Sequence, residues 1–298
     1  MTHQRDAILV TGACGQLGCE LAAALSVHGD VVAVDRAALD LADPAAIVRK
    51  VRAVAPALIV NAGAYTAVDR AEQERERAFA VNANAPGVLA EEAKRIGALL
   101  IHYSTDYVFD GTQGVPYDET VRPNPLNVYG ASKLEGERAI AAAGATALIF
   151  RTSWVYGLRG SNFLLTIRRL AAERDELRIV ADQHGVPNWC RALAEATATL
   201  VGRGVPYLAE RAGLYHLSAT GATSWYEFAR AIVGTAAVPR VVPIATADYP
   251  TPARRPAYGV LATDMFQRAF GFALPEWRAM LQACVTSPAE PPQRVRVR

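Results

Sequence analysis

The stretch Ala7-Ile8-Leu9-Val10-Thr11-Gly12-Ala13-Cys14-Gly15-Gln16-Leu17-Gly18 decides the fold of this chain. Its first four residues are apolar and predict a buried strand, and a helix-forming run follows over about 19–28. Between them, glycines recur every third residue, at Gly12, Gly15 and Gly18. A glycine-rich turn between a strand and a helix lets the backbone approach a pyrophosphate at the positive helix N-terminus. We therefore predict a dinucleotide-binding turn.

The end of the second predicted strand, 31–34, carries two residues that bear on the choice of dinucleotide. Asp35 lies about 20 residues beyond the glycine turn, where a carboxylate can bond the adenosine ribose hydroxyls. Arg36 follows it and could instead hold a 2′-phosphate. The two neighbours favour NADH and NADPH respectively, so the sequence leaves both cofactors open.

Further apolar strands at 57–60, 99–102 and 147–150 alternate with helical stretches. Such buried, non-alternating strands joined by helices are typical of a parallel sheet covered on both faces. We predict an α/β fold with a Rossmann-like, doubly wound parallel sheet. After Trp154 the alternation weakens, which predicts a smaller, discontinuous α/β domain beside it.

Tyr129 and Lys133 lie four residues apart at the start of a helix-forming stretch that ends at Gly144, so they share one helix face. Only three lysines occur in the chain, Lys133 with Lys50 and Lys94. Free tyrosine has a pKa near ~10, and a neighbouring ammonium lowers that pKa towards the range where general acids work best. The pair predicts a tyrosine that donates a proton and a lysine that lowers the pKa of this tyrosine. Two unrelated surface residues would show the same spacing.

The composition excludes several classes of protein. The chain has 298 residues, 51% of them hydrophobic, which supports one large or two modest domains, and its net charge of +2 gives no reason to invoke nucleic acid. Cys14, Cys19, Cys190 and Cys284 show no metal-binding spacing. No stretch approaches the roughly 20 apolar residues that span a bilayer. We expect a cytoplasmic protein with a small-molecule partner, without metal, nucleic acid or membrane.

Three motifs together resemble a known group of enzymes: the glycine turn, the stretch 103–109 (Tyr-Ser-Thr-Asp-Tyr-Val-Phe) and the pair Tyr129 and Lys133. They resemble the extended short-chain dehydrogenase/reductase superfamily and, within it, the dTDP-4-dehydrorhamnose reductase family. The resemblance covers roughly residues 8–277. Further matching stretches are 66–69, 126–130, 150–156, 213–217 and 249–256.

The resemblance implies hydride transfer from NADPH or NADH to the C4 ketone of dTDP-4-dehydro-L-rhamnose, the last step of dTDP-L-rhamnose biosynthesis. Tyr129 would protonate the forming alkoxide, and Lys133 would bond the nicotinamide ribose and lower the pKa of the tyrosine. Thr105 would hydrogen-bond the reacting oxygen, while Asp106 and Trp154 would contact the substrate. The glycine turn and the end of the second strand add Gly12 and Arg36 to the cofactor contacts that the resemblance implies. The expected cofactor contacts are Gly12, Gly15, Gln16, Leu17, Asp35, Arg36, Asp40, Leu41, Ala64, Tyr65, Thr66, Tyr103, Tyr129 and Lys133.

The pair Arg254-Arg255 lies between prolines and suits a diphosphate clamp, so we assign Arg255 to the substrate site. The family shows Asn-Ser after this motif, where the present chain has Ala257-Tyr258-Gly259, which bears on substrate choice. A reductase or epimerase for another nucleotide-activated 4-keto-6-deoxy sugar is therefore one alternative. A non-catalytic, dinucleotide-binding subunit, as in a related branch that binds methionine adenosyltransferase, is another.

The resemblance also implies a division of the chain. Residues 1–155, with returning segments at about 188–220, would form the NAD(P)-binding domain. Residues 156–187 and 221–285 would form the nucleotide-sugar-binding domain, and 286–298 a disordered tail. Some relatives hold a divalent ion at a dimer contact through glutamates, but Arg191 occupies the matching helix here. We therefore expect a monomer or weak homodimer.

Overall fold

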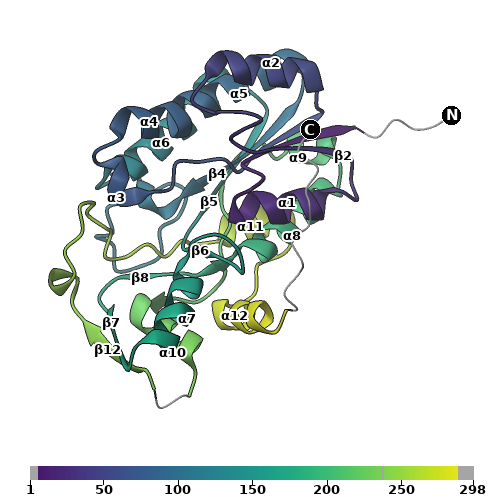
Figure 1. Ribbon diagram of the computed structural model, residues 1–298. Coiled ribbons are helices and arrows are strands. Elements are labelled where there is room, and N and C mark those ends of the chain that lie inside the picture. The colour runs from purple at the N-terminus through teal and green to yellow at the C-terminus, as the bar shows by residue number, and fades with distance from the viewer. Residues whose placement is uncertain (1–5, 236–237, 288–298) are drawn as a thin grey trace.

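The computed structural model describes residues 6–235 and 238–287 (Figure 1). Its centre is a sheet of six strands in the order β2-β1-β3-β4-β5-β10, with every neighbouring pair parallel. The predicted doubly wound parallel sheet is therefore confirmed. The strands are β1 Ala7–Thr11, β2 Asp30–Val34, β3 Leu58–Asn61, β4 Leu99–Thr105, β5 Ala147–Thr152 and β10 Gly213–His216.

Helices cover both faces of this sheet (Figure 1). One face carries α2 Pro44–Val54, α5 Ala85–Ile96 and α6 Val128–Ala143, which pack side by side. The other carries α1 Gln16–Leu25 against α8 Cys190–Val201. Shorter helices are α3 Val68–Ala71, α4 Arg75–Phe79, which continues into a π-helical turn Ala80–Asn84, α9 Val205–Ala209 and α11 Asp264–Phe270.

The second half of the chain adds three small two-stranded sheets. These pair β6 Val155–Tyr156 with β9 Asn188–Trp189, β7 Glu176–Val180 with β12 Arg240–Ile244, and β8 His184–Gly185 with β11 Thr223–Ser224. Helices α7 Phe163–Glu173, α10 Trp225–Val233 and α12 Trp277–Thr286 complete this part. The division into two domains stays a prediction. Thr286 ends α12, and the rest of the expected tail, 288–298, lies outside the described residues.

Local sequence signals placed several element ends well. Asp43 followed by Pro44 predicts a helix start, and Asp43 caps α2 by accepting a hydrogen bond from the Ala46 amide at 3.0 Å. Gly144 ends α6 with a φ of 64°. Two predictions were wrong. Helix α1 begins at Gln16 rather than at residue 19, and the charged run 70–77, which predicts one solvated helix, forms parts of two short helices.

Strand β4 also runs three residues beyond its predicted end at His102, because Tyr103, Ser104 and Thr105 continue the ladder to β5. All seven of its residues are buried. The extension therefore carries the polar end of the strand into the interior, next to the start of α6.

The strand order fixes where a ligand can bind. The chain leaves β1 for β2 on one side and returns to β3 on the other, so the connections diverge at β1 and β3. In open α/β sheets ligands bind at the carboxyl ends of the strands at such a point. Among the described residues, no helix combines the length and apolar character needed to cross a bilayer.

Candidate active site

A cavity of about 660 Å³ opens at the carboxyl ends of these strands. It is lined by all the residues that the sequence assigned to the cofactor, from Gly12 directly after β1 to Lys133 on α6, and by Thr105, Asp106 and Trp154. The structure therefore brings together segments more than 100 residues apart. The roles assigned to these residues stay predictions, because shared position does not by itself show what each one binds.

The glycine turn closes one end of the cavity. Gly12 adopts a φ of +70°, and a Cβ there would lie 2.6 Å from the Cα of Gly63 in the loop that follows β3. A Cβ on Gly18 would lie 2.1 Å from the carbonyl oxygen of Gly12. Helix α1 starts directly behind the turn, and its N-cap Gly15 offers no side-chain cap. The turn thus presents bare backbone and a helix N-terminus, which is the chemistry that a pyrophosphate requires.

Asp35 is held at the end of β2 with its carboxylate facing the same cavity. Its Oδ1 accepts hydrogen bonds from the amides of Ala37 and Ala38, both at 3.0 Å, and its Oδ2 lies 3.5 Å from the Cys14 Sγ. These donors, Ala38 first, lower the pKa of Asp35, so its carboxyl is ionised at neutral pH. The Arg36 side chain is 70% exposed beside it.

Tyr129 and Lys133 stand at the first turns of α6, whose N-cap Asn127 accepts a hydrogen bond from the Gly130 amide at 2.8 Å. The Lys133 ammonium donates to the Tyr103 carbonyl at 2.6 Å and lies 3.2 Å from the Nε2 of His102. Burial lowers the pKa of Lys133 to about 8, partly offset by Glu137.

In this structure burial raises the pKa of Tyr129 to about 12, while a hydrogen bond with Thr105 lowers it and the charge of Asp106 raises it. The ammonium of Lys133 is engaged by the Tyr103 carbonyl and the His102 imidazole on β4. The expected tuning of Tyr129 by Lys133 and the contact of Thr105 with the reacting oxygen stay predictions.

A buried polar chain that sequence reasoning missed supports Lys133. His102 is fully buried, and its Nδ1 lies 3.0 Å from the Nδ2 of Asn61. The Oδ1 of Asn61 accepts from the Thr11 hydroxyl at 2.6 Å. Burial, and then the charge of Lys133, hold the pKa of His102 well below its usual value, so the imidazole is neutral. The signal available in the sequence was a single histidine directly after three apolar strand residues.

Asp106 lies next to Thr105, and only one of its two carboxylate oxygens is hydrogen-bonded within the described part of the chain. Its Oδ1 accepts from the Thr105 hydroxyl at 3.1 Å, while its buried Oδ2 has no hydrogen-bond partner among the described residues. Burial raises the pKa of Asp106 to about 7. Gly259 covers this oxygen, since a Cβ at that position would lie only 2.5 Å from Oδ2. An unpartnered acceptor at a cavity wall suits a substrate hydroxyl.

Trp154 lines the opposite wall in an unusual conformation. Its φ is 42°, a strained value for a bulky residue, and its ring stacks on Trp225 with centroids 3.5 Å apart and an interplanar angle of 9°. Trp225 also lines the cavity and comes from the start of α10. Sequence reasoning missed Trp225, because nothing near it in the chain points to Trp154.

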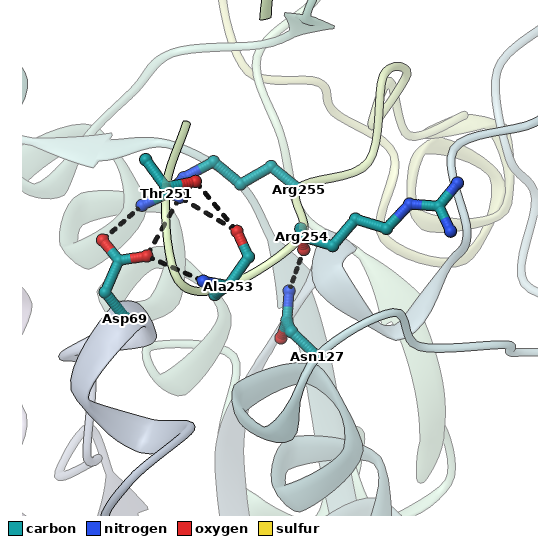
Figure 2. A network of polar contacts seen from close by, with 6 residues as sticks. All are labelled: Asp69, Asn127, Thr251, Ala253, Arg254 and Arg255. Carbon is teal, nitrogen blue, oxygen red and sulfur yellow. Dashed lines mark hydrogen bonds and ion pairs between the residues drawn. The ribbon is translucent and has the colours of Figure 1, made fainter. Parts of the chain in front are cut away.

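Arg255 alone among the predicted site residues does not line the cavity. Figure 2 shows its guanidinium turned to Asp69 on α3, with Thr251 and Ala253 beside it. The Arg254 side chain points away from this network, although its backbone carbonyl belongs to it. The substrate contact expected of Arg255 stays a prediction, and its guanidinium has another partner here.

The architecture and cavity agree with the comparisons to known proteins. The family model described as RmlD substrate binding domain matches residues 6–289. The dTDP-4-dehydrorhamnose reductase of Burkholderia thailandensis is 50% identical over 290 residues, which cover 93% of this chain and 97% of that protein. The chain belongs to the RmlD family of dTDP-4-dehydrorhamnose reductases. The family resemblance seen in the sequence is therefore confirmed.

Other members of this family show the same extent of similarity. The dTDP-4-dehydrorhamnose reductase of Escherichia coli K12 is 44% identical over 282 residues, covering 91% of this chain and 94% of that one. The crystal structure of the Bacillus anthracis dTDP-4-dehydrorhamnose reductase in complex with NADP matches with a TM-score of 0.88 at 35% identity. It covers 94% of this chain and 99% of that chain, so the RmlD fold extends over both halves.

No cluster of three or more His, Cys, Asp or Glu side chains that could hold a metal ion occurs within residues 6–235 and 238–287. Cys14, Cys190 and Cys284 form no disulfide among the described residues, and of these three only Cys14 is exposed.

Proposed function

We propose that this protein reduces the C4 ketone of dTDP-4-dehydro-L-rhamnose to dTDP-L-rhamnose with NADPH or NADH. The observation that carries the proposal is the composition of one cavity. Its glycine turn and Asp35 suit a dinucleotide, and Tyr129, Thr105 and Asp106 lie together at the same sheet edge. Family membership supplies the substrate, because the relatives are named for this reaction.

The fit of the cofactor rests on the glycine turn. Side chains at Gly12 or Gly18 would collide with neighbouring backbone, so the glycines allow this turn to pack closely. The backbone of such a turn can approach a pyrophosphate. Reduced nicotinamide bound in this cavity would supply the hydride. Asp35 would accept hydrogen bonds from the adenosine ribose, and Lys133 would hold the nicotinamide ribose near the reacting centre.

Tyr129 is the group that completes the reduction. When the C4 carbonyl carbon gains a hydride, its oxygen becomes an alkoxide that needs one proton, and the phenol of Tyr129 donates it. The raised pKa of Tyr129 keeps the phenol protonated until that moment. Thr105 hydrogen-bonds the same oxygen, a stabilisation that grows as charge develops there. Solvent then returns a proton to the tyrosinate.

The test compares the wild type with Tyr129→Phe. dTDP-4-dehydro-L-rhamnose is generated in situ, and oxidation of NADPH or NADH is followed by absorbance while the sugar product is identified. General-acid catalysis contributes typically ~10²–10⁴-fold, so the variant should lose at least about 100-fold in kcat and still bind dinucleotide. Turnover of another 4-keto sugar only, tight retention of cofactor as in an epimerase, or dinucleotide binding without turnover would each replace the proposal by an alternative.

We propose further that the protein acts in the cytoplasm as a monomer or weak homodimer, without a metal ion. Cys14, Cys190 and Cys284 form no disulfide among the described residues, which supports a reducing compartment. Sedimentation at micromolar concentration, with and without EDTA, tests the oligomeric state and the metal together. A stable dimer that dissociates with EDTA would contradict both statements.

A further inference from the structure

The loop 251–256 connects two elements that carry the proposed active site (Figure 2). It comes from the C-terminal part of the chain, and it contacts Asp69 on α3 and Asn127 at the start of α6. Helix α3 follows the cavity-lining residues 64–66, and α6 carries Tyr129. We call the set Asp69, Asn127 and loop 251–256 the latch.

The first half of the latch is a two-pronged ion pair. The Nη1 and Nη2 of Arg255 donate to Oδ1 and Oδ2 of Asp69 at 3.1 and 2.8 Å. The Ala253 amide adds a third hydrogen bond to Asp69 Oδ1 at 3.2 Å, and Thr251 accepts from Arg255 at 2.5 Å. The side chains of Arg255 and Asp69 are 22% and 39% exposed. This two-pronged ion pair, or fork, fixes the relative orientation of the two groups as well as their distance.

The second half holds the end of the catalytic helix. Asn127 donates from Nδ2 to the Arg254 carbonyl at 2.8 Å and caps α6 through its Oδ1. Glu72, which directly follows α3, accepts from the Val128 amide at 2.8 Å. The first turn of α6 is thus fastened to the loop and to α3, and these two are fastened to each other by Asp69 and Arg255.

Tyr107 adds a third path between the same groups. Its ring meets the Tyr129 ring edge-on, with centroids 5.6 Å apart, and its side chain interacts with Arg255. Its carbonyl also packs on Gly130, where a Cβ would lie 2.1 Å from the oxygen. Tyr107 therefore connects Arg255 with both Tyr129 and Gly130.

We propose that Asp69 and Arg255 are positioning residues that set the height and angle of the first turn of α6, and thereby the phenol of Tyr129. This deepens the proposed function and rests on it for its kinetic part. It also changes the role of Arg255: the guanidinium acts on the catalytic helix through Asp69 instead of clamping the substrate diphosphate. Breaking the ion pair should then lower kcat while leaving dinucleotide binding intact.

The experiment is a double-mutant cycle of Asp69→Asn, Arg255→Gln and the double variant. Each single variant should lose about 10-fold in kcat with the KM for the sugar changed less than about threefold, because a shift of a fraction of an ångström suffices. The double variant should lose no more than either single one, since both break one interaction. Arg255→Lys should recover only part of the loss, because an ammonium cannot form the fork.

A matched control comes from the same helix. Arg138→Gln removes the Arg138–Glu135 ion pair, which is exposed on α6 at 3.3 Å and touches nothing in the latch. It should keep wild-type kinetics, and its effect should add to that of Arg255→Gln. A rise in sugar KM for Arg255→Gln at unchanged kcat, with Asp69→Asn silent, would overturn the latch and restore the diphosphate clamp.

Hydrogen exchange makes the test independent of turnover. In Arg255→Gln and Asp69→Asn the amides of Val128 and Gly130 should exchange at least about 10-fold faster than in the wild type, and in Arg138→Gln they should not. Unchanged exchange in the first two variants refutes the latch even if the enzyme is active. An inactive wild type with the expected exchange pattern would instead refute the proposed reaction and leave the latch standing.

Discussion

Gly259→Ala is a small substitution that should act on one atom of the active site. A Cβ at this position would lie 2.5 Å from Oδ2 of Asp106 and 3.4 Å from its Cγ, and its three nearest atoms all belong to the Asp106 side chain. The φ of Gly259 lies outside the left-handed region, so alanine fits the local backbone. The perturbation therefore falls on the buried carboxyl whose Oδ2 lacks a partner.

The size of the effect follows from the contact distance. Ordinary van der Waals contact begins at 3.4 Å, so Asp106 or the loop must move by about 1 Å. A misplacement of that size costs up to about 10²-fold in rate when the group orients a substrate. We expect kcat/KM for the sugar to fall ~10- to 100-fold, while overpacking destabilises the fold by about 1–3 kcal/mol.

The assay is steady-state reduction of the 4-keto sugar, with urea unfolding run in parallel. Gly114→Ala is the matched control, because a Cβ there meets nothing within 4 Å. It should leave kcat/KM unchanged. Wild-type kinetics in a folded Gly259→Ala protein would refute the reasoning, since the carboxyl could then move by 1 Å without consequence and Asp106 would not orient the substrate.

Three further predictions concern the cofactor, the proton balance and the fold. Asp35→Asn should raise the ratio of kcat/KM for NADPH to kcat/KM for NADH by about tenfold, and Arg36→Gln should lower this ratio. The reason is that a charged hydrogen bond is worth about 1.5–3 kcal/mol. Parallel assays with both cofactors measure the ratio. The kcat/KM of the wild type should fall as pH rises through about 8, where Lys133 loses its proton. His102→Leu replaces a polar neighbour of the ammonium by an apolar one and should move that midpoint about one unit lower in a pH profile. Gly18→Ala should lower the free energy of unfolding by more than about 3 kcal/mol in urea titration, because its Cβ would lie 2.1 Å from a backbone oxygen.

The parts of the fold that the sequence predicted are those encoded by neighbours in the chain. The strand, glycine turn and helix at the N-terminus follow from apolar runs and glycine spacing, and the Asp43 cap follows from one residue type at one position. Tyr129 and Lys133 were found because helix geometry puts residues four apart on one face. Each of these signals lies within a few residues of the structure that it predicts.

What the sequence did not predict depends on contacts between distant segments. The fork between Asp69 and Arg255 joins residues 186 positions apart, and the Trp154–Trp225 stack joins the residue before β6 to the first residue of α10. The tuning of Tyr129 by Lys133 stays a prediction for the same reason. Spacing along α6 predicted the proximity of the ammonium, but β4 supplies the carbonyl and the imidazole that engage it.

These distant contacts explain how two residues on one helix can serve different tasks. Lys133 is held from the sheet side by the Tyr103 carbonyl and His102, whereas the turn that carries Tyr129 is held from the loop side through Asn127. The two supports share no residue. A substitution in the polar chain should therefore alter the pH dependence, and one in the latch should alter kcat at every pH. If His102→Leu and Arg255→Gln instead produced the same pH profile, the helix would respond as one rigid unit, and the separation of the two supports would be wrong.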